Sequence, residues 1–234
     1  IVGHAVVKSG VDFDSASKEA FDTALKNANI APSQIAFTVS TGYGRKNVCF
    51  SNQAKTEITC HARGAHFYFP EDKILIDIGG QDSKVIKIGS DGNILNFKMN
   101  RKCAAGTGMF LEEIASRLGL DISSLEQLAE KSTVEIELGS FCTVFTQTEI
   151  LARIREGVKV EDLIKGAFKS IVKRIIEMDT LTGKIVLTGG VIAYNKLIAE
   201  ILSERLEREV AVPPLPQFAG AFGAAIIAME MNQK

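Results

Sequence analysis

The sequence predicts an α/β fold built around a mixed sheet, and three observations support that class. Apolar segments at 73–78, 83–88 and 94–99 are separated by short turns, a pattern typical of an antiparallel meander. A further apolar segment at 184–187 ends in two glycines before a helical pattern begins. Most of the remaining chain has apolar residues at helical spacing. Strands interleaved with helices in this way indicate an α/β protein.

Each element follows from a local pattern. At 14–28, small and apolar residues recur at three- and four-residue spacing, which predicts a helix with Asp14 or Ser15 as its N-cap. The Ser-Asp-Gly-Asn sequence at 90–93 predicts a hairpin turn between the second and third meander strands. The other expected elements are strands at 1–8 and 35–40 and helices at 55–67, 109–118, 123–129, 143–154, 160–179, 194–207 and 220–229.

The composition is that of an ordinary globular chain, with 46% hydrophobic and 24% charged residues in a length of 234. A formal net charge of −1 argues against a nucleic-acid partner held by phosphate contacts. No segment reaches the roughly 18 uninterrupted apolar residues of a membrane span. The first ten residues lack the basic region and long apolar run of a signal peptide. We therefore expect a cytoplasmic protein without a membrane partner.

Two glycine turns follow strands and are candidate nucleotide-binding loops. In the first, Asp77 lies at a strand end, two residues before the pair Gly79-Gly80. Glycine lets backbone N–H groups approach a phosphate without a Cβ in the way, and Asp77 or Asp82 could hold Mg²⁺ directly or through water. An ordinary hairpin turn with an acidic rim is the alternative. The second turn, Gly189-Gly190, also leads into a helix, so together the turns predict two lobes that each give a loop to one nucleotide.

The four cysteines allow two interpretations. None is spaced as Cys-x-x-Cys, so four free thiols, some of them buried, are one possibility. The other is a shared cluster, because Cys103 and Cys142 each stand at a predicted helix start, where anions such as thiolates are favoured. A [4Fe–4S] cluster takes four thiolates, which two copies related by a two-fold axis would supply.

Taken together, these segments resemble the activators of 2-hydroxyacyl-CoA dehydratases and the related ATPase subunits of benzoyl-CoA reductase. The resemblance covers nearly the whole chain. It is carried by the segments 41–45 (TGYGR), 60–64 (CHARG), 76–82 (IDIGGQD), 102–108 (KCAAGTG), 142–145 (CTVF), 188–191 (TGGV), 216–217 (PQ) and 220–225 (GAFGAA).

The resemblance implies the two-lobed, ribonuclease H-like ATPase fold shared by actin, the heat-shock chaperone ATPases and sugar kinases. One lobe would comprise residues 1–98, completed by the C-terminal helix at 214–234. The other would comprise residues 99–213 and carry the cysteines and the adenosine loop. ATP would bind in the cleft of each subunit of a homodimer, or of a heterodimer with a paralogue.

The same resemblance implies one [4Fe–4S] cluster at the dimer interface, held by Cys103 and Cys142 of each subunit. An electron from reduced ferredoxin or flavodoxin would pass, driven by ATP, to an acyl-CoA dehydratase or reductase. Asp77 and Gln81 are the expected catalytic residues, with Mg²⁺ beside the nucleotide, and Cys49 and Cys60 are expected to be structural thiols. The expected ATP- or ADP-binding residues are Gly79, Gly80, Gly106, Thr107, Gly108, Gly189, Gly190 and Gln217.

Two features depart from the family pattern. The family begins with a strand and an Asp-x-Gly-Ser/Thr loop that binds the β- and γ-phosphates, whereas this chain starts at what resembles the second strand. The first strand is thus expected to be missing, which puts ATP hydrolysis by this chain alone in question. Met109 stands where the family often has a basic residue, and this bears on the choice of partner.

Three functional hypotheses follow. The first is an ATP-driven electron-transfer enzyme with a cluster. The second is a small-molecule kinase of the same fold, which needs an aspartate as general base, and Asp77 is its candidate. The third is a non-catalytic nucleotide-binding or assembly subunit, which the missing first loop favours.

Overall fold

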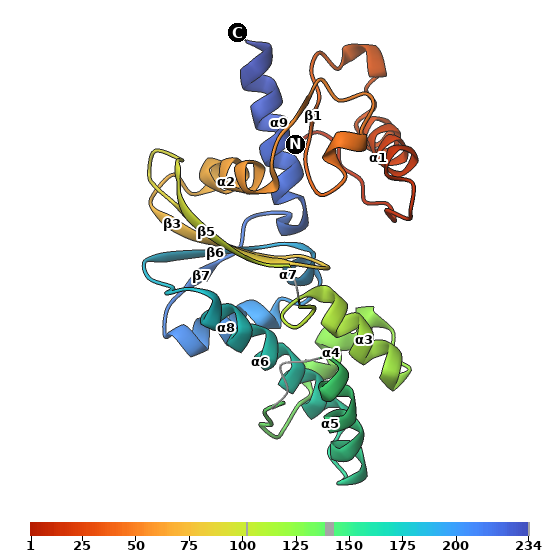
Figure 1. Ribbon diagram of the computed structural model, residues 1–234, viewed down its shortest axis with the longest axis vertical. Coiled ribbons are helices and arrows are strands. Elements are labelled where there is room, and N and C mark those ends of the chain that lie inside the picture. Colours follow the sequence, from red (N-terminus) through yellow and green to blue (C-terminus); the bar gives the residue numbers. More distant parts are fainter. Residues whose placement is uncertain (102, 139–142, 234) are drawn as a thin grey trace. The chain divides into compact units, whose positions relative to one another are not determined.

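The computed structural model describes residues 1–101, 103–138 and 143–233, and the chain forms two compact units. The first unit comprises Ile1–Tyr68 and Phe218–Lys234, and the second comprises Phe69–Gln217. Figure 1 shows the helices and strands of each unit. None of the helices in the described ranges is both long and apolar enough to cross a membrane.

The first unit is mainly helical. Its helix α1 begins after Asp12, whose carboxylate accepts a hydrogen bond of 3.1 Å from the N–H of Ser15. The N-cap therefore lies two residues before the expected Asp14. The elements of the unit are helices α1 (Phe13–Ala28), α2 (Glu57–Tyr68) and α9 (Ala219–Asn232), the parallel strands β1 (Val39–Ser40) and β2 (Gln53–Ala54), and short 3-10 turns at Pro32–Gln34 and Arg45–Asn47.

Helices α2 and α9 of the first unit pack at close range because glycines lie at their contact. A Cβ added to Gly223 would lie 1.7 Å from the carbonyl oxygen of Cys60, and one added to Gly64 would lie 2.3 Å from that of Ala219. Cys60 is fully buried, and this burial raises the pKa of its thiol. Both observations agree with the expectation that Cys60 is a structural thiol.

The strand expected at 1–8 is wrong, because residues 1–10 form neither a helix nor a strand. A strand needs a ladder with a neighbouring strand, and this segment instead packs on helix α1. A Cβ on Gly3 would lie 2.4 Å from the carbonyl oxygen of Ala24 and 2.8 Å from Cβ of Ala28. The strand expected at 35–40 is reduced to its last two residues, which pair with β2.

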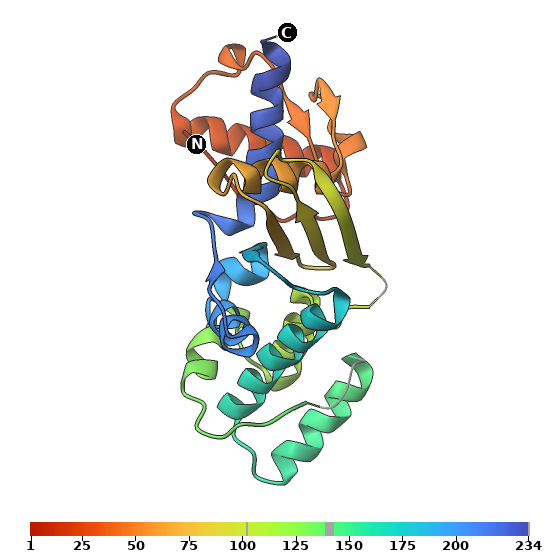
Figure 2. The ribbon, with the colours of Figure 1, turned by 90° about the vertical axis from the view of Figure 1, so that its left-hand side faces the viewer.

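The second unit contains a five-stranded mixed sheet in the order β5-β4-β3-β6-β7. Strands β3, β4 and β5 form the expected antiparallel meander, drawn as three neighbouring arrows in Figure 2, and β6 and β7 continue the sheet in parallel with β3. The turn at 90–93 is confirmed, with Gly92 at φ +79°. The strands are β3 (Lys73–Ile78), β4 (Ser83–Ile88), β5 (Ile94–Asn100), β6 (Lys184–Thr188) and β7 (Val210–Ala211).

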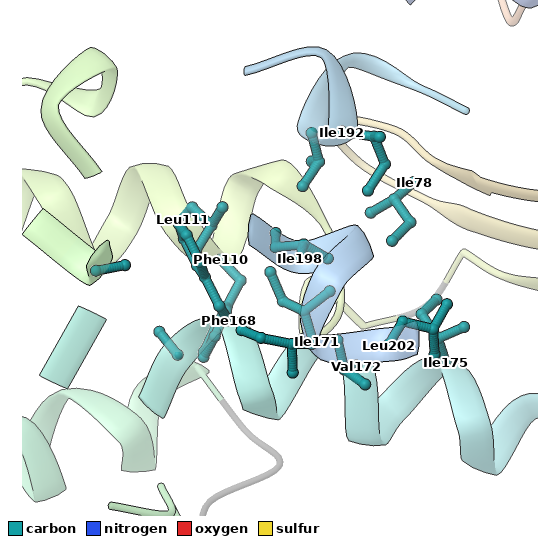
Figure 3. Close-up of a cluster of buried hydrophobic side chains, with 14 of the residues drawn as sticks. Ile78, Phe110, Leu111, Phe168, Ile171, Val172, Ile175, Ile192, Ile198 and Leu202 are labelled. Carbon is teal, nitrogen blue, oxygen red and sulfur yellow. The ribbon is translucent and has the colours of Figure 1, made fainter. Parts of the chain in front are cut away.

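Helices of the second unit bury one face of this sheet (Figure 1). Alternate residues of β3 point into the core, as the period of two in a strand requires. Figure 3 shows Ile78 near Ile192 of α7, and the same cluster contains side chains from α3, α6 and α8, including Phe110, Phe168 and Ile198. The helices are α3 (Gly108–Leu118), α4 (Leu125–Glu130), α5 (Thr143–Arg155), α6 (Val160–Met178), α7 (Gly190–Tyr194) and α8 (Leu197–Leu206), with 3-10 turns at Ile122–Ser124 and Pro216–Phe218.

The helix expected at 194–207 begins later than predicted, because α7 ends at Tyr194 and α8 starts at Leu197. Asn195 between them has a non-helical backbone, and its side-chain amide donates to the carbonyl of Val191 over 3.0 Å. The compact units also differ from the expected lobes, since strands β3–β5 fall in the second unit, where β3 pairs with β6. The division into lobes at 98/99 and 213/214 stays a prediction.

Candidate functional site

The two glycine turns of the sequence come together at one edge of the sheet in the second unit. Strands β3 and β6 are parallel neighbours, so their carboxyl ends meet, and Asp77 pairs in register with Thr188. Gly189 has φ +105°, and a Cβ there would lie 2.2 Å from the carbonyl oxygen of Ile78. Only glycine allows this approach. Ligands of open α/β sheets bind at such carboxyl ends, so this edge is the candidate nucleotide site.

The outer glycine of each turn faces open space. A Cβ added to Gly80 would meet no heavy atom of the described chain within 4 Å, and one added to Gly190 would meet only Nε2 of Gln217, at 3.9 Å. The structure therefore places Gln217 beside the second turn, and its role in nucleotide binding stays a prediction. Gln81 is exposed. Gly79 closes the first turn, since its N–H donates to the carbonyl of Asp82 over 2.9 Å. The exposed backbone leaves room for a ligand that binds main-chain groups.

A buried lysine joins the carboxylates of the first turn. Nζ of Lys84 lies 3.2 Å from Oδ2 of Asp77 and 2.7 Å from Oδ1 of Asp82. Oγ1 of Thr188 donates to Oδ1 of Asp77 over 3.2 Å. The side chains of Lys84 and Asp77 are only 3% and 5% exposed, whereas that of Asp82 is 24% exposed. Sequence reasoning missed Lys84, although the meander register places it opposite Asp77.

This arrangement bears on the expected Mg²⁺ ligands. Both carboxylate oxygens of Asp77 accept a hydrogen bond from a protein donor, and the ammonium of Lys84 already balances its charge, so contact with Mg²⁺ through water suits Asp77 better than direct ligation. Asp82 is the better exposed of the two carboxylates. The assignment of Asp77 and Gln81 as catalytic residues stays a prediction.

The start of helix α3 is bonded to the first glycine turn. The N–H of Gly108 donates to the carbonyl of Gly79 over 2.9 Å, and the N–H of Met109 donates to that of Gly80 over 2.7 Å. A Cβ added to Gly108 would lie 3.1 Å from Cα of Gly80. Because these two N–H groups already have acceptors, they do not form the free anion site expected of a helix start. They instead tie the segment that carries Cys103 to the candidate nucleotide site.

Gly106 and Thr107 lie in the loop before α3, and contacts of that loop explain both residue types. Gly106 has φ +82°, and a Cβ there would lie 2.9 Å from Cγ of Arg174, which requires glycine. Thr107 is fully buried, and its backbone N–H and its hydroxyl both donate to the carbonyl of Ala104, over 3.1 Å and 2.6 Å. Gly106 and Thr107, in the loop between Cys103 and helix α3, are thus held by contacts within the second unit rather than open to a ligand.

Of the two cysteines expected to bind a cluster, the structure describes one. Cys103 is partly exposed in the loop before α3, while Cys142 lies outside the described residues. Across the described ranges, no three side chains of histidine, cysteine, aspartate or glutamate are grouped as a metal site. A partly exposed thiol is compatible with ligation of a cluster, and the assignment of Cys103 and Cys142 as ligands stays a prediction.

The fold and this edge of the sheet define an α/β nucleotide-binding protein of the actin-like ATPase class. MreB 5 of Spiroplasma citri, solved with AMPPNP, shares the fold over 97% of this chain and 79% of its own, with a TM-score of 0.58 and 15% identity. At that identity the likeness shows the fold alone.

The chain belongs to the BadF/BadG/BcrA/BcrD ATPase family, whose model matches residues 4–228. It is similar to component A of the (R)-2-hydroxyglutaryl-CoA dehydratase of Acidaminococcus fermentans, with 38% identity and a TM-score of 0.94 over 100% of this chain and 91% of that chain. It is also similar to the 2-hydroxyisocaproyl-CoA dehydratase activator of Clostridium difficile, solved with bound ADPNP, with 36% identity and a TM-score of 0.88 over 94% of this chain and 82% of that chain. The family and the fold predicted from the sequence are thereby confirmed.

Proposed function

We propose that this chain is the ATP-dependent electron-transfer activator of a 2-hydroxyacyl-CoA dehydratase. Its relatives at 36–38% identity are dehydratase components and activators, one of them solved with an ATP analogue. The observation that carries the proposal is the direct backbone bonding between the Gly79-Gly80 turn and the start of α3, five residues after Cys103. One rigid connection thus joins a candidate phosphate loop to a candidate cluster ligand.

In this proposal, the two turns of the second unit bind ATP or ADP through their open backbone. Gly80 and Gly190 let main-chain groups approach phosphate and adenosine, and Gln217 lies beside the second turn. Lys84 neutralises the buried charge of Asp77. Mg²⁺, where bound, would accompany the nucleotide rather than be held directly by Asp77.

We further propose that Cys103 and Cys142 of two subunits hold one [4Fe–4S] cluster, which supplies one-electron chemistry when bound. The second subunit is an identical copy or a paralogue. Reduced ferredoxin or flavodoxin is the proposed donor, and the dehydratase is the acceptor. A benzoyl-CoA-type reductase is the alternative acceptor.

The test is anaerobic reconstitution of the chain with iron and sulfide, followed by measurement of bound iron, oligomeric state and ADP release. We expect iron and acid-labile sulfide in a dimer, and ATP turnover that increases with an electron acceptor. Cys103→Ser should lose the iron but keep the fold by circular dichroism. Cys49→Ser is the matched control, because Cys49 is exposed and lies in the other compact unit. No iron in the wild-type chain would refute the proposal.

Two alternatives remain testable in the same assay. ADP release that depends on a small hydroxyl substrate, without an electron acceptor, would instead support a kinase. Tight ADP binding with no turnover, either alone or with a dehydratase, would support an assembly subunit.

A further inference from the structure

The loop between strand β5 and helix α3 is held by its carbonyl groups. Each carbonyl of residues 103–106 accepts a hydrogen bond from a side chain or backbone group of the second unit. Asn100 supplies two of these bonds. Its Nδ2 donates to the carbonyl of Cys103 over 3.1 Å and to that of Ala105 over 3.0 Å. An amide NH₂ has two hydrogens, so this single group satisfies both acceptors.

The remaining two carbonyls have donors of their own. Thr107 donates to the carbonyl of Ala104, and the hydroxyl of Ser83 donates to that of Gly106. Ser83 is fully buried and pairs in register with Asn100 at the end of the β4–β5 ladder. The donors on both strands therefore belong to one rigid rung of the sheet.

We infer that Asn100 is a positioning residue that holds Cys103 in place for cluster binding. This inference rests on the proposed function. Asn100 acts on the carbonyl of Cys103 itself and on that of the residue two positions later, and Ser83 holds the loop one residue further along. With the backbone held on both sides of Ala104, the thiol of Cys103 projects from a fixed point. A ligand fixed before the metal arrives binds it more tightly than one that must be ordered on binding.

The test compares Asn100→Asp with Asn96→Asp. Aspartate has nearly the shape of asparagine but no N–H donor, so Asn100→Asp removes both hydrogen bonds and keeps the side-chain volume. Asn96 lies on the same strand, is exposed, and its side-chain oxygen accepts a local bond from the N–H of Phe97. The control thus makes the same charge change on the same strand without touching the loop.

Two readouts separate loop positioning from the proposed function. Hydrogen–deuterium exchange of the apo-protein should show faster exchange for residues 104–109 in Asn100→Asp, by roughly tenfold for the loss of two neutral hydrogen bonds. The reconstituted protein should release iron to a chelator about tenfold faster, and the electron paramagnetic resonance spectrum of the reduced cluster should change. Asn96→Asp should match the wild type in every readout.

If Asn100→Asp holds iron as well as the wild type and gives the same spectrum, the inference is overturned and the proposed function stands. If the wild type binds no iron, both are overturned, whatever the exchange data show. Should Asn100→Asp fail to fold, Ser83→Ala replaces it. That variant loses one bond to the same loop, so it should give a smaller increase in iron release, and no increase would overturn the inference.

Discussion

The ion pair between Lys84 and Asp77 allows a quantitative test of how the candidate site is built. Replacing Lys84 with Met keeps most of the side-chain length but removes the ammonium. The carboxylate of Asp77 would then stay buried, at 5% exposure, with the hydroxyl of Thr188 as a remaining donor. A buried charge that has lost its partner is strongly unfavourable because water cannot solvate it.

The expected cost follows from this burial. Removal of one partner of a buried ion pair destabilises a protein by about 3–5 kcal/mol. The change also removes the contact of 2.7 Å between Nζ of Lys84 and Oδ1 of Asp82. The matched control is Lys87→Met on the same strand. Lys87 is 31% exposed and pairs with Asp179, which is 9% exposed but keeps Lys98 and the N–H of Thr180 as partners, so the loss of Lys87 should cost only about 1 kcal/mol.

Urea unfolding followed by circular dichroism measures both effects, and the slope of the transition should not change. The double variant Lys84→Met with Asp77→Asn provides the decisive comparison. It removes both charges, so it should recover a large part of the stability lost in Lys84→Met alone. A cost below about 1 kcal/mol for Lys84→Met, or a double variant no more stable than Lys84→Met alone, would contradict a stabilising buried ion pair.

Further predictions concern acid stability and helix packing. Hydrogen bonds from the N–H groups of Val134 and Thr133 and from the hydroxyl of Ser132 lower the pKa of Asp162. The ionised group therefore stabilises the fold above its unfolded pKa, and this stabilisation is lost as the pH falls through its folded pKa. In unfolding curves measured over a pH series, Asp162→Asn should reduce the loss of stability at acid pH, and an unchanged loss would contradict this. Gly223→Ala should lower the melting temperature although alanine favours helices, because its Cβ would overlap a backbone carbonyl of α2. Equal melting temperatures for the variant and the wild type would show that α2 and α9 can separate.

Much of the local structure was predictable from short-range patterns. Short apolar segments and the Ser-Asp-Gly-Asn turn predicted the meander at nearly its observed bounds. The same pattern implied the register that puts Lys84 opposite Asp77, since a four-residue turn between Ile78 and Ser83 determines every later pair in that hairpin.

Other features depended on contacts that no local pattern contains. The segment 1–8 has the composition of a strand, but a strand requires a neighbour, and this one packs on helix α1 instead. Likewise, nothing near Asn100 in the sequence shows that its amide meets two carbonyls of the following loop. The loop must first turn back towards the end of its own strand.

By itself, the sequence determined the family, the fold class, the two glycine turns and the candidate ligand Cys103, because each depends on residue types at short spacing. Only the tertiary structure shows that the two glycine turns and the segment of Cys103 lie next to one another. The turns lie more than 100 residues apart in the chain and become neighbours because β6 pairs in parallel with β3. The first turn contacts the segment of Cys103 because the first N–H groups of helix α3 have no acceptor within the helix. The N–H groups of Gly108 and Met109 donate instead to the carbonyls of Gly79 and Gly80.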